Sequence, residues 1–389
     1  MRKPPRVAVL SSVHEALDPR IFHKQARTLA AAGFEVHLLA RAERREVRDG
    51  VRIHALPQPR ARWARPWQWL RLARATVRLR PDVIHIHDPE LLPLVLVLKR
   101  LTGAAAVYDA HEYYGEEVAR REWIPRPLRR PAAQVTDAVE GFVARRIDAV
   151  VAVNEHMAAR FRRRGARAIA VHNFPPAEYF GLDAADERDG GAPVRAGGDS
   201  PVVGYVGLLS RDRGLQMVLA ATELLRGRIA AVRVRVIGRV DWSGVSEGTS
   251  RDRAEWAACG LDLAGTIPAA DVPGALAGID IGWIPFQDTA NNRRTIPLKL
   301  LEYMAAGKPV VASDIGYIAA IVRESGCGLL VPPDDAWAHV NALATLIEDP
   351  ERARRMGDAG REAVRSRYTW APEGRRLAAL YRSILGVAQ

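Results

Sequence analysis

Short, fully apolar runs alternate with longer amphipathic segments along most of the chain, and this alternation restricts the fold more than any other feature. In the first half the runs occupy residues 7–10, 36–40, 83–86, 104–108 and 149–153, and in the second half residues 201–209, 232–238, 279–286, 308–313 and 327–332. Strands that are apolar on both faces and separated by helices are typical of parallel sheets covered by helices on both sides. The sequence therefore predicts an α/β fold built from doubly wound sheets.

One segment interrupts this alternation. From Gly181 to Pro201 the sequence reads GLDAADERDGGAPVRAGGDSP, which is rich in Gly, Asp and Pro and poor in apolar residues. A chain of 389 residues is long enough for two domains, and such a segment is typical of a linker between them. We therefore expect an N-terminal domain over residues 1–180, a linker over 181–200, a C-terminal domain over 201–370 and a final helix within 371–389.

Positive charge is concentrated in the N-terminal half. Residues 1–180 contain 32 Lys and Arg against 19 Asp and Glu, a balance of +13, whereas residues 181–389 contain 25 against 26, a balance of −1. The densest part, Pro59 to Arg80, places Trp63, Trp67, Leu70 and Val77 at helical spacing among seven arginines. This pattern predicts contact with an anionic membrane surface. An ordinary solvated surface is the alternative, since only five of the 57 basic residues are lysine, and nucleic acid is not expected because no base-stacking or groove-reading pattern accompanies the charge.

Several common classes are excluded by motifs that the sequence lacks. No GxGxxG follows the first apolar run, and no GxxxxGK[ST] occurs, because Glu302 and Pro309 stand at two required positions around Gly307 and Lys308. Dinucleotide oxidoreductases and P-loop NTPases are therefore not expected. Two cysteines provide neither a disulfide framework nor a structural zinc site, and the N-terminal apolar run is too short for a secretory signal, so we expect a cytoplasmic protein.

The segment RRTIPLKLLEYMAAGKPVVAS, residues 293–313, combines three groups that suit a nucleotide diphosphate. A helix that starts near Pro297 and continues to about residue 306 would leave unpaired amides at its N-terminus for an anion. The residues of this helix mouth are Thr295, Ile296, Pro297 and Leu298. Lys299 adds a positive charge, and the Glu302 carboxylate, on the same helix face, can accept hydrogen bonds from a ribose diol. The alternative is a capped amphipathic helix with a surface lysine and glutamate.

The same segment, PLKLLEYMAAGKPVVAS, resembles the C-terminal signature of the retaining glycosyltransferases of family 4, which have the GT-B fold. Further similar segments are VAVLSSVHEALDPRIFHKQARTLAAAGFEVHLLA, DVIHIHDPELLP, VYDAHEYY, VHNFP and GYVGLLSRDRGLQMVLAA. The resemblance implies two Rossmann-like domains that face each other across a cleft, with a nucleotide sugar held mainly by the C-terminal domain and an acceptor mainly by the N-terminal one. It also implies that the final helix returns to the N-terminal domain and that the chemistry needs no metal or other cofactor.

The resemblance also assigns roles to particular residues. Gly207 falls at the tight turn that begins the nucleotide domain, Arg213 and Lys299 are the leading cations for the diphosphate, and His111 contacts the donor sugar. Two positions depart from the family pattern. Arg294 stands where family members have the first of two glutamates, and Leu208 stands where an arginine commonly follows the turn glycine. We therefore expect rearranged contacts to the donor.

On the acceptor side, the resemblance and the strand ends single out Asp18, Arg20, His87 and Glu112. Asp18 precedes Pro19, so capping of the first helix is an alternative and slightly favoured role. Glu112 could instead be only solvated, and His111 could be a structural histidine. A metal site is a weaker alternative to hydrogen-bonding groups along a cleft; its candidate ligands would be His85, His87, Asp88, Asp109 and His111.

The sequence thus predicts a retaining glycosyltransferase that moves a sugar from a nucleotide-diphosphate sugar, with UDP as the first choice, to a hydroxyl group of a glycan or lipid-linked acceptor. We expect it at the inner face of the cytoplasmic membrane. Two alternatives remain. One is a non-catalytic glycan- or nucleotide-binding subunit on the same fold, which the departures at Arg294 and Leu208 would suit. The other is a nucleotide-sugar epimerase, which would need no acceptor.

Overall fold

The computed structural model describes residues 3–57, 65–121, 123–182, 200–243, 256 and 259–387. The expected linker falls mostly on residues 183–199, which lie outside the described residues, as does Trp63. The chain divides into two compact units. The N-terminal unit consists of Met1–Asn173 together with Trp370–Gln389, and the C-terminal unit consists of Phe174–Thr369.

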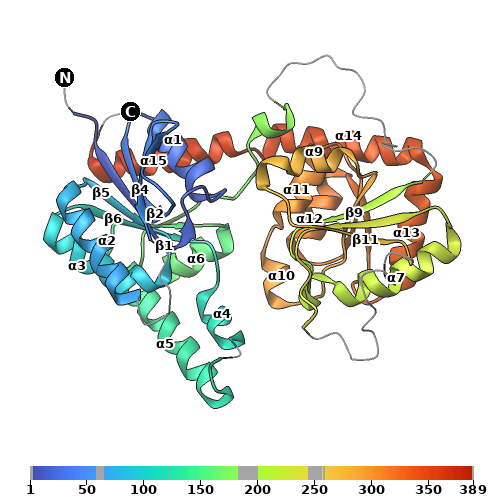
Figure 1. The fold of residues 1–389 in the computed structure, drawn as a ribbon, viewed down its shortest axis with the longest axis horizontal. Helices are drawn as coiled ribbons and strands as arrows, with labels where there is room; N and C mark the ends of the chain where they lie inside the picture. Colours follow the sequence, from blue (N-terminus) through green and yellow to red (C-terminus); the bar gives the residue numbers. More distant parts are fainter. Residues whose placement is uncertain are drawn as a thin grey trace. The chain divides into compact units, whose positions relative to one another are not determined.

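The N-terminal unit is built on a sheet with the strand order β3-β4-β2-β1-β5-β6-β7-β8, in which only the β3–β4 pair is antiparallel among the described strands (Figure 1). Its strands are β1 (Arg6–Glu15), β2 (Glu35–Arg41), β3 (Glu46–Arg48), β4 (Val51–Leu56), β5 (Val83–Ile86), β6 (Ala105–Ala110), β7 (Ala149–Ala152) and β8 (Ala168–Ala170). Five of the predicted apolar runs form central strands of this sheet. The short strands β3, β4 and β8 were not predicted.

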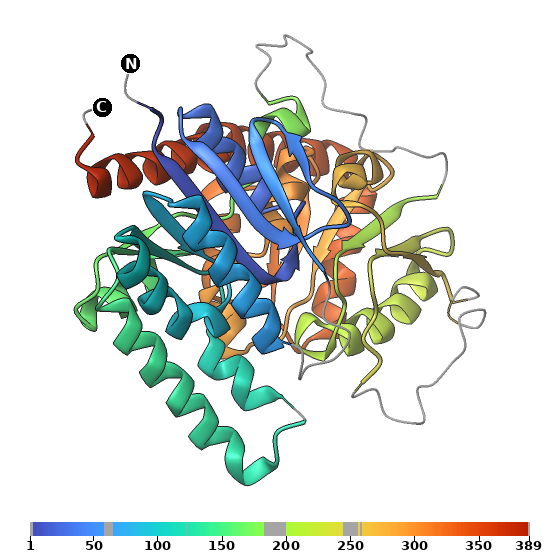
Figure 2. The same ribbon diagram turned by 60° about the vertical axis from the view of Figure 1, so that its left-hand side comes forward.

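Helices cover both faces of this sheet (Figures 1 and 2). One face carries α2 (Arg65–Leu79), α3 (Leu92–Thr102), α5 (Arg126–Ala144) and α6 (Glu155–Arg163), whose inner residues share a core with Ile84 and Tyr108. The other face carries η1 (Ile21–Ala26), α1 (Arg27–Ala31) and α15 (Trp370–Leu385), around Phe22 and Leu29. A short helix, α4 (Tyr114–Arg120), packs against α5.

The final helix, α15, belongs to the N-terminal unit, which confirms the prediction that the C-terminus returns to it. Its predicted apolar positions Leu377 and Tyr381 are fully buried. The Trp370 indole donates to the Thr28 hydroxyl over 2.8 Å, and the Tyr381 hydroxyl lies 2.7 Å from Nδ1 of His85. These contacts fix α15 to α1 and to β5.

The C-terminal unit has a parallel sheet with the strand order β11-β10-β9-β12-β13-β14. Its strands are β9 (Val202–Val206), β10 (Arg233–Ile237), β11 (Leu261–Gly265), β12 (Ile281–Ile284), β13 (Val310–Ser313) and β14 (Gly328–Val331). Its helices include α7 (Leu215–Arg228), α9 (Val272–Ala277), α10 (Ala290–Arg294), α11 (Leu298–Ala305), α12 (Gly316–Ser325), α13 (Ala336–Glu348) and α14 (Pro350–Arg367). In this unit α7 packs against α13 and α11 packs against α14. The two parallel-sheet units confirm the predicted α/β architecture.

Candidate functional site

The carboxyl end of β9 carries a tight turn at Gly207. Gly207 has a φ of +101°, and its amide donates to the Ile237 carbonyl over 2.7 Å. A Cβ atom on Gly238 would lie 2.2 Å from the Gly207 carbonyl oxygen, so both positions need glycine. The turn therefore brings backbone close to the edge of the sheet where open α/β sheets bind their ligands.

Helix α11 is fixed against this edge by Tyr303. The Tyr303 hydroxyl donates to the Gly204 carbonyl over 3.0 Å and accepts from the Val206 amide over 2.8 Å. Its ring fits because Gly282 has no side chain: a Cβ there would lie 2.4 Å from the ring. Pro297 is the residue before the helix, with an extended ψ of 129°, so the helix begins at Leu298, one residue later than the sequence predicted. The first amides of α11 have no partner within the helix.

Lys299 lies in the interior, with 7% of its surface exposed. Its Nζ atom stands 3.5 Å from the centre of the Tyr205 ring, and it has no hydrogen-bond partner among the described residues. A Cβ on Gly207 would lie 3.6 Å from that Nζ, so the ammonium borders the turn. Burial lowers the pKa of Lys299 well below its ordinary value, and the nearby Arg213 lowers it further. The sequence did not predict this burial.

Arg213 ends the short helix η5 (Arg211–Arg213), and its Nη1 lies 3.5 Å from the Leu208 carbonyl oxygen. Arg213 and Lys299 thus place two cations close together. Glu302, half-buried one turn along α11, raises the pKa of Lys299, whereas Arg213 lowers it. Two positive charges in a partly desolvated environment repel each other unless an anion binds beside them. The arrangement therefore suits an anionic ligand.

The remaining residues of the helix mouth have more structural roles. The Thr295 hydroxyl donates to the Asn291 carbonyl over 3.0 Å, and Ile296 packs against the hydrophobic core. Arg294, one of the two departures from the family pattern, is the last residue of α10, and its Nε donates to the Ala290 carbonyl over 2.7 Å. The structure thus brings Gly207, Arg213, Lys299 and Glu302 together.

In the N-terminal unit, Asp109 at the end of β6 organises a buried polar cluster. The Arg20 guanidinium binds both of its oxygens, with Nε 3.0 Å from Oδ1 and Nη2 3.0 Å from Oδ2, and the Gln25 amide also donates to it. His111 places Nδ1 3.2 Å from Oδ1 of Asp109, and the Tyr114 hydroxyl lies 3.2 Å from its Nε2. Of these three residues His111 is the most exposed: 16% of its side chain is accessible, against 8% for Arg20 and none for Asp109.

These contacts correct the expectation that Arg20 and His87 line the acceptor side. Both are buried: Arg20 serves the Asp109 carboxylate, and His87 has no exposed surface. His85, His87 and Asp109 present ligand-type atoms within 4.8 Å of one another. Because Arg20 already neutralises both oxygens of Asp109, a metal cation there would meet the guanidinium charge. Asp88 and His111 from the sequence-based metal set are not part of this group.

Asp18 and Glu112 lie nearer the surface. The Asp18 carboxylate accepts from the amides of Arg20 and Ile21 over 2.8 and 2.9 Å, which is the capping role that the sequence favoured. Glu112 is exposed and follows His111 at the carboxyl end of β6.

Sequence reasoning missed one pair at this edge, His14 and Asp88. Nδ1 of His14 lies 2.9 Å from Oδ1 of Asp88, and the other oxygen accepts from the amide of Ser12 and the hydroxyl of Ser11. The hydrogen bond to Asp88 raises the pKa of His14 despite partial burial. Burial alone would raise the pKa of Asp88, but these hydrogen bonds lower it to about 2. The His14 ring lies 5.5 Å from the His111 ring.

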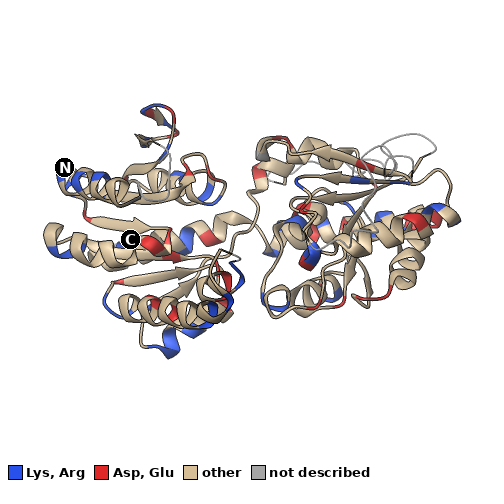
Figure 3. Cartoon of the chain, turned by 60° about the horizontal axis from the view of Figure 1, so that its bottom comes forward, with Lys and Arg blue, Asp and Glu red and all other residues tan. Residues whose placement is uncertain are grey.

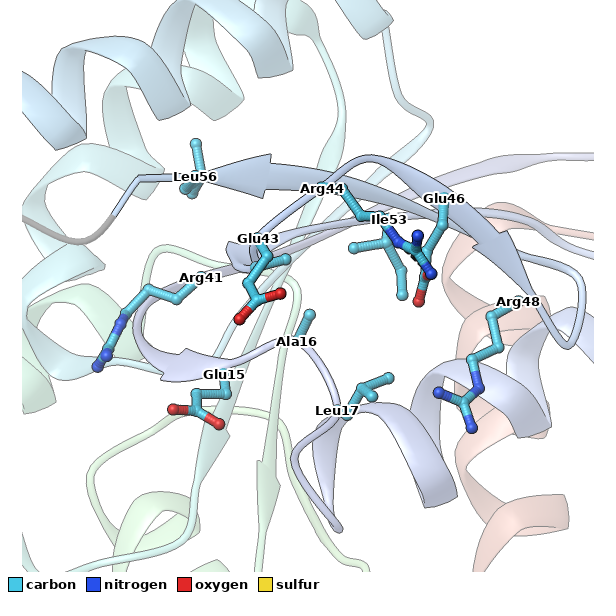
Figure 4. Close-up of a pocket in the computed structure, with 11 residues that line it drawn as sticks. Glu15, Ala16, Leu17, Arg41, Glu43, Arg44, Glu46, Arg48, Ile53 and Leu56 are labelled. Atoms are coloured by element: carbon cyan, nitrogen blue, oxygen red, sulfur yellow. Dashed lines mark ion pairs between the residues drawn. The ribbon is translucent and has the colours of Figure 1, made fainter.

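A cavity of about 640 Å³ opens beside this edge, between the ends of β1 and β2 and strand β4 (Figure 4). Its charged lining is Glu15, Arg41, Glu43, Arg44, Glu46 and Arg48. Carboxylates and guanidinium groups that alternate around a cavity provide donors and acceptors for a polar ligand rich in hydroxyl groups. The charged residues come from the ends of β1 and β2, from the loop after β2 and from β3, so no single sequence motif marks the cavity.

Comparisons with known proteins agree with this geometry. Residues 19–177 match the family described as glycosyl transferase 4-like domain, and residues 200–349 match glycosyl transferases group 1. The two matches together cover most of the chain and fall one on each unit. The chain belongs to the group 1 glycosyltransferases of the family 4 type. It is therefore a glycosyltransferase, as predicted.

This glycosyltransferase has relatives of known name. It is 28% identical over 298 residues to a GDP-mannose-dependent α-(1-6)-phosphatidylinositol monomannoside mannosyltransferase of Mycolicibacterium smegmatis. The alignment covers 74% of this chain and 73% of that protein. It is 26% identical over 313 residues to a phosphatidyl-myo-inositol mannosyltransferase of the same organism, across 78% of this chain and 72% of that one.

Solved structures show the same fold. Sucrose-phosphate synthase from Thermosynechococcus elongatus aligns with a TM-score of 0.73 and 22% identity, over 98% of this chain and 99% of that chain. HepE from Anabaena in complex with UDP-glucose aligns with a TM-score of 0.67 and 16% identity, over 97% and 99%. These similarities confirm the predicted GT-B fold.

Proposed function

We propose that the protein transfers a hexosyl residue, with retention at the anomeric carbon, from a nucleotide-diphosphate sugar to a hydroxyl group of a glycan or lipid-linked acceptor. The observation that carries the proposal is the pair of cations, Arg213 and Lys299, beside Gly207 and the open N-terminus of α11. A diphosphate supplies the anionic charge that this pair lacks. Glu302, on the same face of α11, is the acceptor for the ribose hydroxyls.

In the proposed reaction, the bond between the anomeric carbon and the diphosphate oxygen breaks as the acceptor oxygen bonds to the same face of that carbon. The proton of the acceptor hydroxyl passes to the departing diphosphate. Arg213, Lys299 and the α11 amides stabilise the negative charge that develops there. These groups carry the role that a metal ion has in other transferases, so we propose that no metal or other cofactor is needed.

The N-terminal unit supplies the acceptor side. We assign the donor-sugar contact to His111, because Asp109 and Tyr114 fix its ring and part of it reaches the surface. The polar cavity lined by Glu15, Arg41 and Glu43 is the proposed acceptor pocket. Glu112 follows β6, which is separated from β1 by β5 in the sheet. Asp18 stabilises the start of η1 by accepting from the amides of Arg20 and Ile21.

We also propose a donor nucleotide and a class of acceptor. UDP is our first choice of nucleotide and GDP is the second. The GDP-mannose dependence in the name of one relative supports GDP. Two relatives are named for phosphatidylinositol substrates, which supports a lipid-linked acceptor and a peripheral position at the inner face of the cytoplasmic membrane. No described helix is both long and apolar enough to cross a bilayer.

The experiment is a matrix of UDP- and GDP-sugars, read first by thermal shift and then by donor hydrolysis without acceptor. Ligands that bind the native state raise its apparent stability. We expect one nucleotide to stabilise the protein and its sugar conjugate to be hydrolysed slowly, with activity unchanged by EDTA. Binding without any hydrolysis or transfer would favour a non-catalytic subunit, and turnover to an epimeric nucleotide sugar without acceptor would favour an epimerase.

A further inference from the structure

Helix α5 exposes an apolar face that nothing in the described N-terminal unit covers. Its exposed apolar residues are Leu128, Val135, Val139 and Phe142, with exposed fractions of 56%, 63%, 37% and 46%. Their spacing of seven, four and three residues puts them on one side of the helix. We call these four residues the α5 stripe.

The α5 stripe is not the face that holds the helix in the fold. The buried residues of α5 are Glu140, Gly141, Val143 and Ala144, and Val143 and Ala144 belong to the core between the helices and the sheet. Helix α5 therefore carries exposed apolar residues besides those that pack on the sheet. A solvent-exposed apolar row of this length marks an interaction surface.

The position of the helix supports contact with an extended surface. In Figures 1 and 2, α4 and α5 form a hairpin whose tip extends beyond the rest of the N-terminal unit. Trp123, between the two helices, is 61% exposed at this tip. Tryptophan favours the boundary between apolar lipid and water, because its ring is apolar and its indole N–H is polar.

The charged residues near the α5 stripe indicate which kind of partner binds it. Exposed arginines stand near both ends of α5: Arg126 and Arg130 near its start, Arg145 and Arg146 just after its end. The Arg146 guanidinium lies 3.5 Å from the centre of the Phe142 ring. The acidic side chains of α5, Asp137 and Glu140, instead pair with Arg160 of α6. An apolar row between arginines matches acyl chains beneath lipid phosphates.

The neighbouring helices extend the same surface. On α2, Trp67, Leu70 and Val77 are exposed, and residues 65–80 contain no Asp or Glu. On α3, Val97 and Leu101 are exposed. These helices cover the same face of the sheet as α5. Figure 3 shows Lys and Arg in blue and Asp and Glu in red on the N-terminal unit. Two copies joined through this face would oppose arginine to arginine, whereas an anionic bilayer neutralises them.

We propose that the N-terminal unit docks on an anionic lipid bilayer through the α4–α5 hairpin, with the α5 stripe and Trp123 in the interface and the flanking arginines on lipid phosphates. The inference deepens the proposed function and rests on it, because a lipid-linked acceptor must be reached at a membrane. It shifts the main contact from the basic segment around residues 59–80, which the sequence indicated, to α5.

The test is sedimentation of the full chain with vesicles of phosphatidylcholine alone or mixed with phosphatidylglycerol. We expect binding only to the mixed vesicles. The triple variant Leu128→Ser, Val135→Ser, Phe142→Ser should bind about 100-fold more weakly, since three exposed side chains no longer enter the apolar region. Arg126→Gln with Arg130→Gln should bind about tenfold more weakly and lose most of the salt dependence. Trp337→Ser, which removes an equally exposed tryptophan of the C-terminal unit, is the matched control and should bind like the wild type.

Equal vesicle binding by the wild type and the triple variant, or no binding by the wild type, would overturn the proposal. A wild-type dimer that the triple variant converts to monomers, with vesicle binding unchanged, would assign the stripe to a second copy instead. Donor hydrolysis measured without vesicles separates the two proposals. If vesicles bind and no nucleotide sugar is hydrolysed, the proposed function fails while the docking surface stands.

Discussion

Replacement of Lys299 by methionine should make the protein more stable and unable to bind its donor. Methionine keeps the buried apolar stem against Tyr205 but removes an amine that has no hydrogen-bond partner among the described residues. A buried polar group without a partner costs about 1–3 kcal/mol. We therefore expect Lys299→Met to raise the free energy of unfolding of the C-terminal unit by about 2 kcal/mol, which corresponds to about 4–8 °C in Tm for a domain of this size.

The effect on ligand binding should have the opposite sign. A nucleotide diphosphate at 100 times its Kd should stabilise the wild type by about 2.7 kcal/mol, and the variant should show little of this shift because the buried ammonium is missing. The stability gain should also shrink with rising pH. The pKa of Lys299 is lowered in the folded state, so the cost of its charge is fully present below that pKa and disappears as the pH approaches the ordinary lysine value.

Lys308→Met is the matched control. Lys308 is also buried, and its Nζ also lacks a hydrogen-bond partner among the described residues, but it precedes β13 at the sheet edge opposite Gly207. The nucleotide-induced shift should persist in this variant. Differential scanning fluorimetry with and without UDP and GDP measures both quantities. A Lys299→Met protein that is less stable than the wild type would show that the buried amine does not destabilise the fold, and one that keeps the full nucleotide shift would show that Lys299 does not bind the diphosphate.

Four further predictions follow from single contacts. Glu302→Ala should weaken UDP or GDP binding by about 10- to 100-fold but leave inorganic pyrophosphate binding unchanged, by calorimetry, because only the ribose loses its acceptor. Gly207→Ala should lower both Tm and nucleotide affinity, since a side chain at a φ of +101° is strained and would stand 3.6 Å from Nζ of Lys299; an unchanged Tm would contradict this. In an NMR titration, the raised pKa of His14 should fall in Asp88→Asn, and an unaltered titration would remove the pair from the account. Burial lowers the pKa of His85 to about 4, so the free energy of unfolding should fall as the pH drops from about 6.5 toward 4. The expected loss is about 3 kcal/mol, at about 1.4 kcal/mol per pKa unit. In urea unfolding, the free energy of unfolding of His85→Gln should depend less on pH.

The sequence predicted the architecture because buried parallel strands leave a local signal. The predicted apolar runs became strands of both sheets, all of them internal except the edge strand β14. Strands β3, β4, β8 and β11 were missed because they are short or carry polar residues. Helix α11 was also predicted, since its proline and its apolar spacing are local features.

The parts that were missed depend on contacts between distant segments. The burial of Lys299 arises from Tyr205, which packs against it from β9, and no local pattern marks that contact. His14 and Asp88 are adjacent only because β1 pairs with β5. Arg20 and His87 were expected to line the acceptor side of the cleft, but the ion pair of Arg20 with Asp109 and the packing of His87 around β5 keep them buried. The apolar face of α5 could not be separated from a core face in the sequence, because burial on one side and exposure on the other are properties of the fold.

We propose above all that the turn at Gly207, Arg213, Lys299 and the α11 N-terminus bind the diphosphate of an activated sugar. The decisive experiment is a crystal structure of the complex with the stabilising nucleotide diphosphate. We predict the phosphates between the Gly207 turn and the first amides of α11, within hydrogen-bond distance of the Arg213 guanidinium and Nζ of Lys299, and the ribose hydroxyls on Glu302. A nucleotide bound with its phosphates away from α11, or with Lys299 still covered and uninvolved, would contradict the claim.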